Sequence, residues 1–227
     1  MRKYGGRYST QLGIHLADAQ PSELFKWFLA SILFGARITE TIGIRTYRVM
    51  EIEEVLSPKV ILEKGWDRLV EILDSGGYVR YDFKTATKIL EMSKNLIEQY
   101  QGDLNRLHAA SANSEDLERR LKSFAKGIGD VTVNIFLREM RGVWEKAKPT
   151  PLDLAVNAAH TLAIIPRKKM SGLVVLNYLL KAWKNAGKKA KNFPDLEAAL
   201  VRAGKDLKKR EKRIRKLQMS PEDSSPR

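Results

Sequence analysis

Two glycines that flank an isoleucine, Gly127-Ile128-Gly129, mark the segment of this chain whose chemistry is most readily inferred. Apolar spacing predicts one helix before them, from Glu115 to Phe124, and another after them, from Asp130 to Met140. Glycine adopts backbone angles that a side chain forbids, so this turn can approach another surface closely. The amides at the start of the second helix are unpaired and face outward, which makes a site for an anion such as phosphate.

The charge of the chain favours a polyanionic partner for this turn. Lysine and arginine number 41 against 27 aspartate and glutamate, a net charge of +14. Residues 205–216 carry eight bases and two acids, a net +6, which leaves +8 elsewhere. We therefore expect the turn to bind a DNA phosphate, and an ordinary connection between helices is the alternative. The residues expected to contact DNA here are Lys126, Gly127, Ile128, Gly129, Asp130 and Thr132.

Composition limits the other kinds of chemistry. With 227 residues, 43% apolar and 8% aromatic, the chain can form one large or two small packed domains. It has no cysteine, which excludes disulfides, thiolate metal sites and cysteine-ligated iron–sulfur clusters, and three histidines make us expect no zinc site. No run of about 18 uncharged apolar residues and no secretion signal is present, so we expect an intracellular protein of the cytoplasm or nucleoid, without a membrane partner.

The elements that must position the turn are predicted to be entirely helical. The helices are expected over residues 21–33, 39–50, 57–62, 66–73, 82–100, 103–109, 115–124, 130–140, 152–165, 173–183 and 194–203. We expect one lobe at 21–113, a second at 114–203 with 1–20, and a basic, flexible tail at 204–227. Residues 1–20 show only weak apolar spacing, so we expect them to begin as a basic, mobile arm. Its Arg2, Lys3 and Arg7 could touch phosphate.

Four segments in this order resemble the helix-hairpin-helix-GPD superfamily of DNA glycosylases, whose best-known member is endonuclease III. They are Ile32-Leu33-Phe34-Gly35-Ala36-Arg37-Ile38-Thr39-Glu40, Gly77-Tyr78 to Lys84-Ala86, Lys126-Gly127-Ile128-Gly129, and Leu152-Asp153. The similarity spans residues 21–165. It implies a two-lobed all-α protein with a DNA-binding cleft between the lobes. Such a protein flips a modified or mismatched base out of the duplex, because the glycosidic bond cannot be reached inside the stack.

The resemblance implies that Asp153 is the catalytic residue, since the family has an aspartate at the start of a helix behind a proline-containing loop. Breaking a glycosidic bond develops positive charge on the sugar, which a fixed carboxylate can stabilise, or it can orient an attacking water. Without the resemblance, Asp153 in the first turn after Pro151 complements the helix dipole.

The sequence departs from the family at two positions. Val131 stands where members that also nick the backbone have a nucleophilic lysine, which implies a monofunctional glycosylase or an inactive relative. Arg37 replaces a glutamine that fills the gap left by the flipped base. It could fill the gap, bind a phosphate or the edge of the orphaned base, or be an ordinary surface cation beside Glu40.

The loop Gly77-Tyr78-Val79-Arg80-Tyr81 falls where the family inserts a wedge side chain into DNA. Tyr78, Arg80 and Tyr81 are therefore expected to contact DNA, with core packing as the alternative for both tyrosines. We expect the partner to be double-stranded DNA and the protein to be a monomer. We expect no cofactor, although the hairpin could hold a monovalent cation.

The leading hypothesis is thus a monofunctional DNA glycosylase of base-excision repair. A non-catalytic DNA-binding or lesion-recognition protein of the same fold is the second. A third is an RNA-binding or assembly protein that acts through the basic C-terminal third, in which case removal of 204–227 should eliminate nearly all affinity for nucleic acid.

Overall fold

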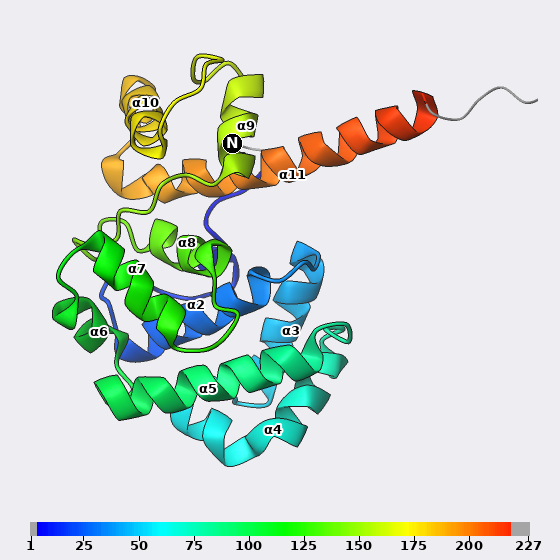
Figure 1. The fold of residues 1–227 in the computed structure, drawn as a ribbon, viewed down its shortest axis with the longest axis vertical. Coiled ribbons are helices and arrows are strands. Elements are labelled where there is room, and N and C mark those ends of the chain that lie inside the picture. The colour runs from blue at the N-terminus through cyan, green and yellow to red at the C-terminus, as the bar shows by residue number, and fades with distance from the viewer. Residues whose placement is uncertain (1–3, 219–227) are drawn as a thin grey trace, which may run out of the picture. The chain divides into compact units, whose positions relative to one another are not determined.

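The computed structural model describes residues 4–218, and over this range helices joined by turns and loops are present, with no β-strand (Figure 1). The all-α prediction is confirmed for these residues. The expectations for Arg2, Lys3 and residues 219–227 lie outside the described range. Among the described helices, none combines the length and the apolar character needed to cross a membrane.

Two compact units make up the chain. The large unit is Arg7–Pro149, and the small unit combines the chain up to Gly6 with the residues from Thr150 onward. The division falls at the proline-rich segment 148–151, and the expected lobe boundary at 113/114 lies inside the large unit. Because residues from both ends of the sequence share the small unit, this unit is discontinuous in the chain.

The large unit is built around one buried helix, α2. Its side chains Leu24, Phe28 and Leu29 have no exposed area, as expected of a helix that is apolar on most of its surface. Helices α3, α5, α6 and α8 pack against it. The helices of this unit are α1 (Tyr8–Gln11), α2 (Pro21–Phe34), α3 (Glu40–Ile52), α4 (Pro58–Ser75), α5 (Asp82–Tyr100), α6 (Leu104–Ala110), α7 (Ser114–Ser123) and α8 (Asp130–Glu139).

Helix α4 joins two segments that the sequence predicts as separate helices. The chain bends at Gly65, where φ is 74° and ψ is 179°, so the expected helices at 57–62 and 66–73 are the two arms of one bent element. A positive φ is readily available to glycine alone, which explains why the bend lies there.

The prediction of a mobile arm at the N-terminus is wrong for residues 7–20. Tyr8 is 2% exposed and Leu12 is 1% exposed, and both are part of the core. The backbone N–H groups of Tyr8 and Ser9 donate to the two carboxylate oxygens of Glu139, at 2.9 and 3.0 Å. Glu139 has no exposed area. Its partners lie more than a hundred positions away in the sequence, so local patterning could not reveal this anchor.

The small unit contains α9 (Asp153–Thr161), α10 (Gly172–Asn185), a short 3-10 helix (Ala190–Asn192) and α11 (Phe193–Gln218). Helix α9 ends before the expected Ile165, and Ala163 just beyond it has a left-handed φ of 54°. Helix α11 continues past the expected end at Ala203. Up to Gln218, the residues expected to form a flexible tail are its C-terminal part.

Candidate nucleic-acid interface

The glycine turn lies between two helices, as predicted: α7 ends at Ser123 and α8 begins at Asp130. Gly127 has a φ of +92°, a conformation that disfavours any other residue. Gly129 is the N-cap of α8, and no side chain caps this helix by a hydrogen bond. A Cβ atom added to Gly129 would meet no other atom within 4 Å. The amides that begin α8 are therefore left open to an external acceptor.

Aromatic packing fixes the hairpin from below. Phe124, at the end of α7, has no exposed area and packs edge-on against Phe28 and Tyr100, with ring centroids 6.0 and 5.9 Å apart. Ile128 is 4% exposed, and its N–H donates to the Ala125 carbonyl at 3.1 Å. The side chain and the amide of Ile128 are thus both used within the turn, and the expected contact of Ile128 with DNA stays a prediction.

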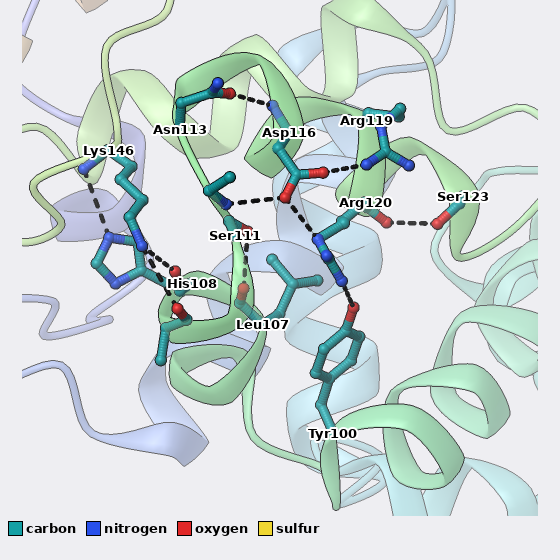
Figure 2. Close-up of polar contacts among 12 residues, drawn as sticks. Tyr100, Leu107, His108, Ser111, Asn113, Asp116, Arg119, Arg120, Ser123 and Lys146 are labelled. Atoms are coloured by element: carbon teal, nitrogen blue, oxygen red, sulfur yellow. Dashed lines mark hydrogen bonds and ion pairs between the residues drawn. The ribbon is translucent and has the colours of Figure 1, made fainter.

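A polar network ties the start of α7 to α5 (Figure 2). The Asp116 carboxylate accepts hydrogen bonds from the Ala112 N–H and from Arg120 Nε, each at 2.9 Å. Arg120 Nη1 in turn donates to the Tyr100 hydroxyl of α5 at 3.0 Å. The Ala112 N–H and Arg120 hold the pKa of Asp116 below its usual range. The first helix of the hairpin is thereby held in place at both ends, by this network and by Phe124.

Cations gather at the turn. Lys126 is exposed, Lys122 pairs with the exposed Asp130, and Lys88 of α5 reaches the turn from a separate helix. Lys88 Cε lies 3.1 Å from the position that a Cβ of Gly127 would occupy. Within residues 4–218 its ammonium has no hydrogen bond or ion pair, and burial lowers its pKa. Sequence reasoning missed Lys88, because only the packing of α5 beneath the hairpin brings it there.

Three predicted segments meet at the C-terminal end of α2. Gly35 lies so close to the first turn of α8 that an added Cβ would be 2.1 Å from Thr132 Oγ1. The Tyr78 hydroxyl, from the α4–α5 loop, donates to the Leu33 carbonyl at 2.9 Å. Arg37 is exposed in the α2–α3 loop, two residues after Gly35. The structure thus brings the hairpin helix, the α2–α3 loop and the α4–α5 loop around one point of the large unit.

Two of the residues expected to contact DNA have side chains that are buried in the core. Tyr78 is 1% exposed, and burial raises the pKa of its hydroxyl well above the usual range. It therefore cannot stack in a duplex, and the core-packing alternative holds. Thr132 is 4% exposed because its side chain lies against Gly35, so it too has no side-chain surface to offer a ligand.

The exposed side chains of the α4–α5 loop are its next residues. Val79 is 63% exposed and Arg80 is exposed, with its guanidinium carbon 5.6 Å from the centroid of the half-buried Tyr81 ring. Two features fix this loop. Gly77 has a φ of +86°, and Arg45 Nε donates a hydrogen bond to the Gly76 carbonyl at 2.7 Å. Val79 was not among the residues predicted to contact DNA, because nothing in the local pattern shows which side chain of this turn is exposed.

Asp153 is the first residue of α9, in the small unit, and it is exposed. Within the described residues its carboxylate has no hydrogen bond or ion pair, so it does not cap α9 by a side-chain bond. The Leu152 carbonyl instead accepts from the Ala155 and Val156 N–H groups, at 2.8 and 3.0 Å. The carboxylate is available to a ligand, and its position also complements the dipole of α9.

The hairpin offers few ligands to a monovalent cation. The carbonyls of Phe124, Ala125 and Gly129 already accept hydrogen bonds from Asn95 Nδ2, the Ile128 N–H and the Val133 N–H. Each therefore retains one lone pair for a cation. Among residues 4–218, no three histidine, aspartate or glutamate side chains converge as a metal site would require.

Comparison with known proteins adds no relative to this picture: no family model matches the chain, and no curated protein matches it.

Proposed function

We propose that this protein is a monofunctional DNA glycosylase that binds duplex DNA through the α7–α8 hairpin. The observation that supports this proposal best is the convergence of three segments at the end of α2. An uncapped helix start, an exposed arginine loop and a loop with an exposed apolar side chain lie together in one compact unit. These are the three kinds of group that a protein needs to hold a phosphate, face a base and enter a duplex.

Each segment has a distinct role in this proposal. The open amides after Gly129, together with Lys126 and Lys88, bind a backbone phosphate. Arg37 faces the base or phosphate beside the flipped nucleotide. Val79, in place of the buried Tyr78, is the apolar side chain that enters the stack, and Arg80 binds the backbone beside it.

Asp153 supplies the chemistry. As the bond between C1′ and the base nitrogen breaks, its carboxylate stabilises the positive sugar and orients a water molecule, whose oxygen adds to C1′. The base leaves with a proton, and an abasic site remains in an intact strand. Val131, at the start of α8, is 48% exposed but apolar, so it cannot form the Schiff base that leads to strand cleavage.

The test is incubation with a panel of duplexes that each contain one modified or mismatched base, followed by hot alkali and gel electrophoresis. We expect cleavage of at least one duplex after alkali only. Asp153→Asn should abolish excision and leave duplex affinity nearly unchanged, because the substitution keeps the shape of an exposed side chain. Asp67→Asn, at an exposed position of α4, is the matched control and should excise normally. Trapping of a covalent adduct with borohydride would contradict the monofunctional mechanism.

A non-catalytic DNA-binding protein of the same architecture is the second candidate. It is favoured by two departures: Val131 stands where backbone-nicking members of the proposed family have lysine, and Arg37 stands where endonuclease III-like members have glutamine. Tight, salt-sensitive binding of every duplex without excision of any base would identify this candidate. Asp153→Asn would then change nothing.

A further inference from the structure

The C-terminal part of α11 carries a line of cations that the proposed site does not use. Lys205, Lys208, Lys209, Lys212 and Arg213 follow one another at alternating steps of three and one, so they share one face of the helix. We call these five residues the basic stripe. All five are exposed.

The stripe points away from the small unit because the opposite face of α11 is anchored. Leu207 is half-buried and packs against the core of this unit. At Gly204, an added Cβ would lie 2.3 Å from the Leu154 carbonyl of α9, so the two helix backbones touch where they cross. Beyond this crossing α11 runs on as a single helix past α9 (Figure 1).

The stripe does not serve the stability of its own helix. Lys208, Lys209, Lys212 and Arg213 form no ion pair within residues 4–218, and like charges three and four positions apart repel. The acidic residues of this stretch, Asp206 and Glu211, form no ion pair with these four bases in the described part of α11. Within the described residues, the charges of Lys208, Lys209, Lys212 and Arg213 are therefore not neutralised by an acidic side chain, and such charges on a rigid element are suited to an external polyanion.

Spacing and polarity indicate which polyanion it is. From Lys205 to Arg213 the helix rises about 12 Å, a length along which B-DNA presents about seven phosphate charges. A helix that binds a lipid surface needs a broad apolar face. Between Lys205 and Arg215, Ile214 is the one large apolar side chain that is exposed, so a membrane is the poorer match.

We propose that the basic stripe is a second DNA-binding surface, which binds the sugar–phosphate backbone of duplex DNA without reading its sequence. It rests on the proposed function only for the choice of duplex DNA as the partner. The stripe would hold the protein on undamaged duplex between lesions, while the hairpin and Asp153 act at the lesion.

The test compares two full-length variants that each lose three exposed lysines. The stripe variant is Lys208→Gln, Lys209→Gln and Lys212→Gln, and the control is Lys59→Gln, Lys64→Gln and Lys94→Gln on α4 and α5. Affinity for a lesion-free duplex is measured from about 50 to 200 mM salt. We expect the stripe variant to bind at least about tenfold more weakly at low salt, and its log–log salt slope to fall by about 2 to 3. The control should keep the wild-type slope.

Further measurements separate the possible outcomes. Replacing the same three lysines by arginine should restore the slope, which links the effect to charge rather than to folding. Equal slopes for the stripe variant and the control would overturn the proposal. The proposal would also be overturned if the stripe variant lost binding to phosphatidylserine vesicles but kept its affinity for DNA. Excision by the wild type at saturating enzyme tests the proposed function separately, and a reduced slope without any excision would still support the stripe.

Discussion

The two glycines of the hairpin have different physical roles. Gly127 needs its left-handed φ of +92°, and Lys88 already occupies the space beside it. Gly129 has an extended backbone and open space around the position of its missing Cβ. Only Gly127 is therefore required by the fold. The lack of a side chain at Gly129 leaves the first amides of α8 accessible.

We expect Gly127→Ala to lower the free energy of unfolding by about 1–2 kcal/mol, since alanine is strained in a left-handed conformation. Gly129→Ala should leave stability within about 0.5 kcal/mol of the wild type. It should nevertheless weaken DNA binding by about tenfold, because its methyl group projects into the space where a phosphate would approach. Urea denaturation and a duplex-binding assay measure the two effects. Unchanged DNA affinity in Gly129→Ala would argue against phosphate binding at this turn.

At the residue scale, the sequence predicted features that the local backbone determines. It did not predict the positions of side chains that depend on packing between helices. The glycine turn and the exposure of Lys126, Arg37 and Arg80 follow from local composition. The inward direction of Tyr78 depends on the Leu33 carbonyl of another helix, and Lys88 reaches the hairpin only through the packing of α5. No pattern within either segment contains this information.

At the scale of elements, the position of the hairpin depends on polar contacts that join the first turn of α7 to the end of α5. Asp116 of α7 accepts the Ala112 N–H and binds Arg120, which reaches α5 through Tyr100. These partners stabilise the ionised carboxylate, and the lowered pKa of Asp116 expresses that preference. The pairing of α7 with α5 is therefore sensitive to acid.

Acid should remove the contribution of Asp116 to the stability of the fold. A carboxylate whose pKa is lower in the folded protein stabilises the fold above its usual pKa, and the contribution disappears as the pH falls through the folded value. We expect Asp116→Asn to be less stable than the wild type at neutral pH, with the difference shrinking from about pH 4 downward. Chemical denaturation across this range measures it. Glu91→Gln, at an exposed position of α5, should show no such convergence.

The ends of helices were predictable where glycine or proline interrupts the helical pattern. They were less predictable where no such residue follows the helix. The glycine and proline signals around α2, α5 and α8 placed these helices to within a few residues. Helix α11 has no such stop after Ala203, and its charged continuation forms helix up to Gln218. The N-terminal segment was misjudged because the carboxylate that anchors it, that of Glu139, belongs to the end of α8.

At the scale of the whole molecule, the two units have separate cores. The core of the small unit depends on the close crossing of α9 and α11, where Gly204 leaves room for the Leu154 carbonyl. The large unit has its own centre in α2. A defect at the crossing should therefore be confined to one unit.

We expect Gly204→Ala to destabilise the small unit by about 1–3 kcal/mol, because its Cβ would overlap the Leu154 carbonyl. Hydrogen exchange should accelerate in α9 and α11 and stay unchanged in α2 and α8. Lys208→Ala, at an exposed position of the same helix, should leave exchange unchanged throughout. Faster exchange in α2 as well as in α9 would show that the units unfold together.

The discontinuity of the small unit has a consequence for the order of events on the ribosome. Residues 7–149 form a contiguous unit that can fold as soon as they leave the exit tunnel. Residues 4–6 cannot reach their final contacts at that stage, because their partner Arg202 is synthesised after residue 149. Arg202 Nη1 donates to the carbonyls of Tyr4 and Gly6 at 2.8 and 2.5 Å. Residues 4–6 are therefore fixed in place only after a unit that follows them in the sequence has been able to fold.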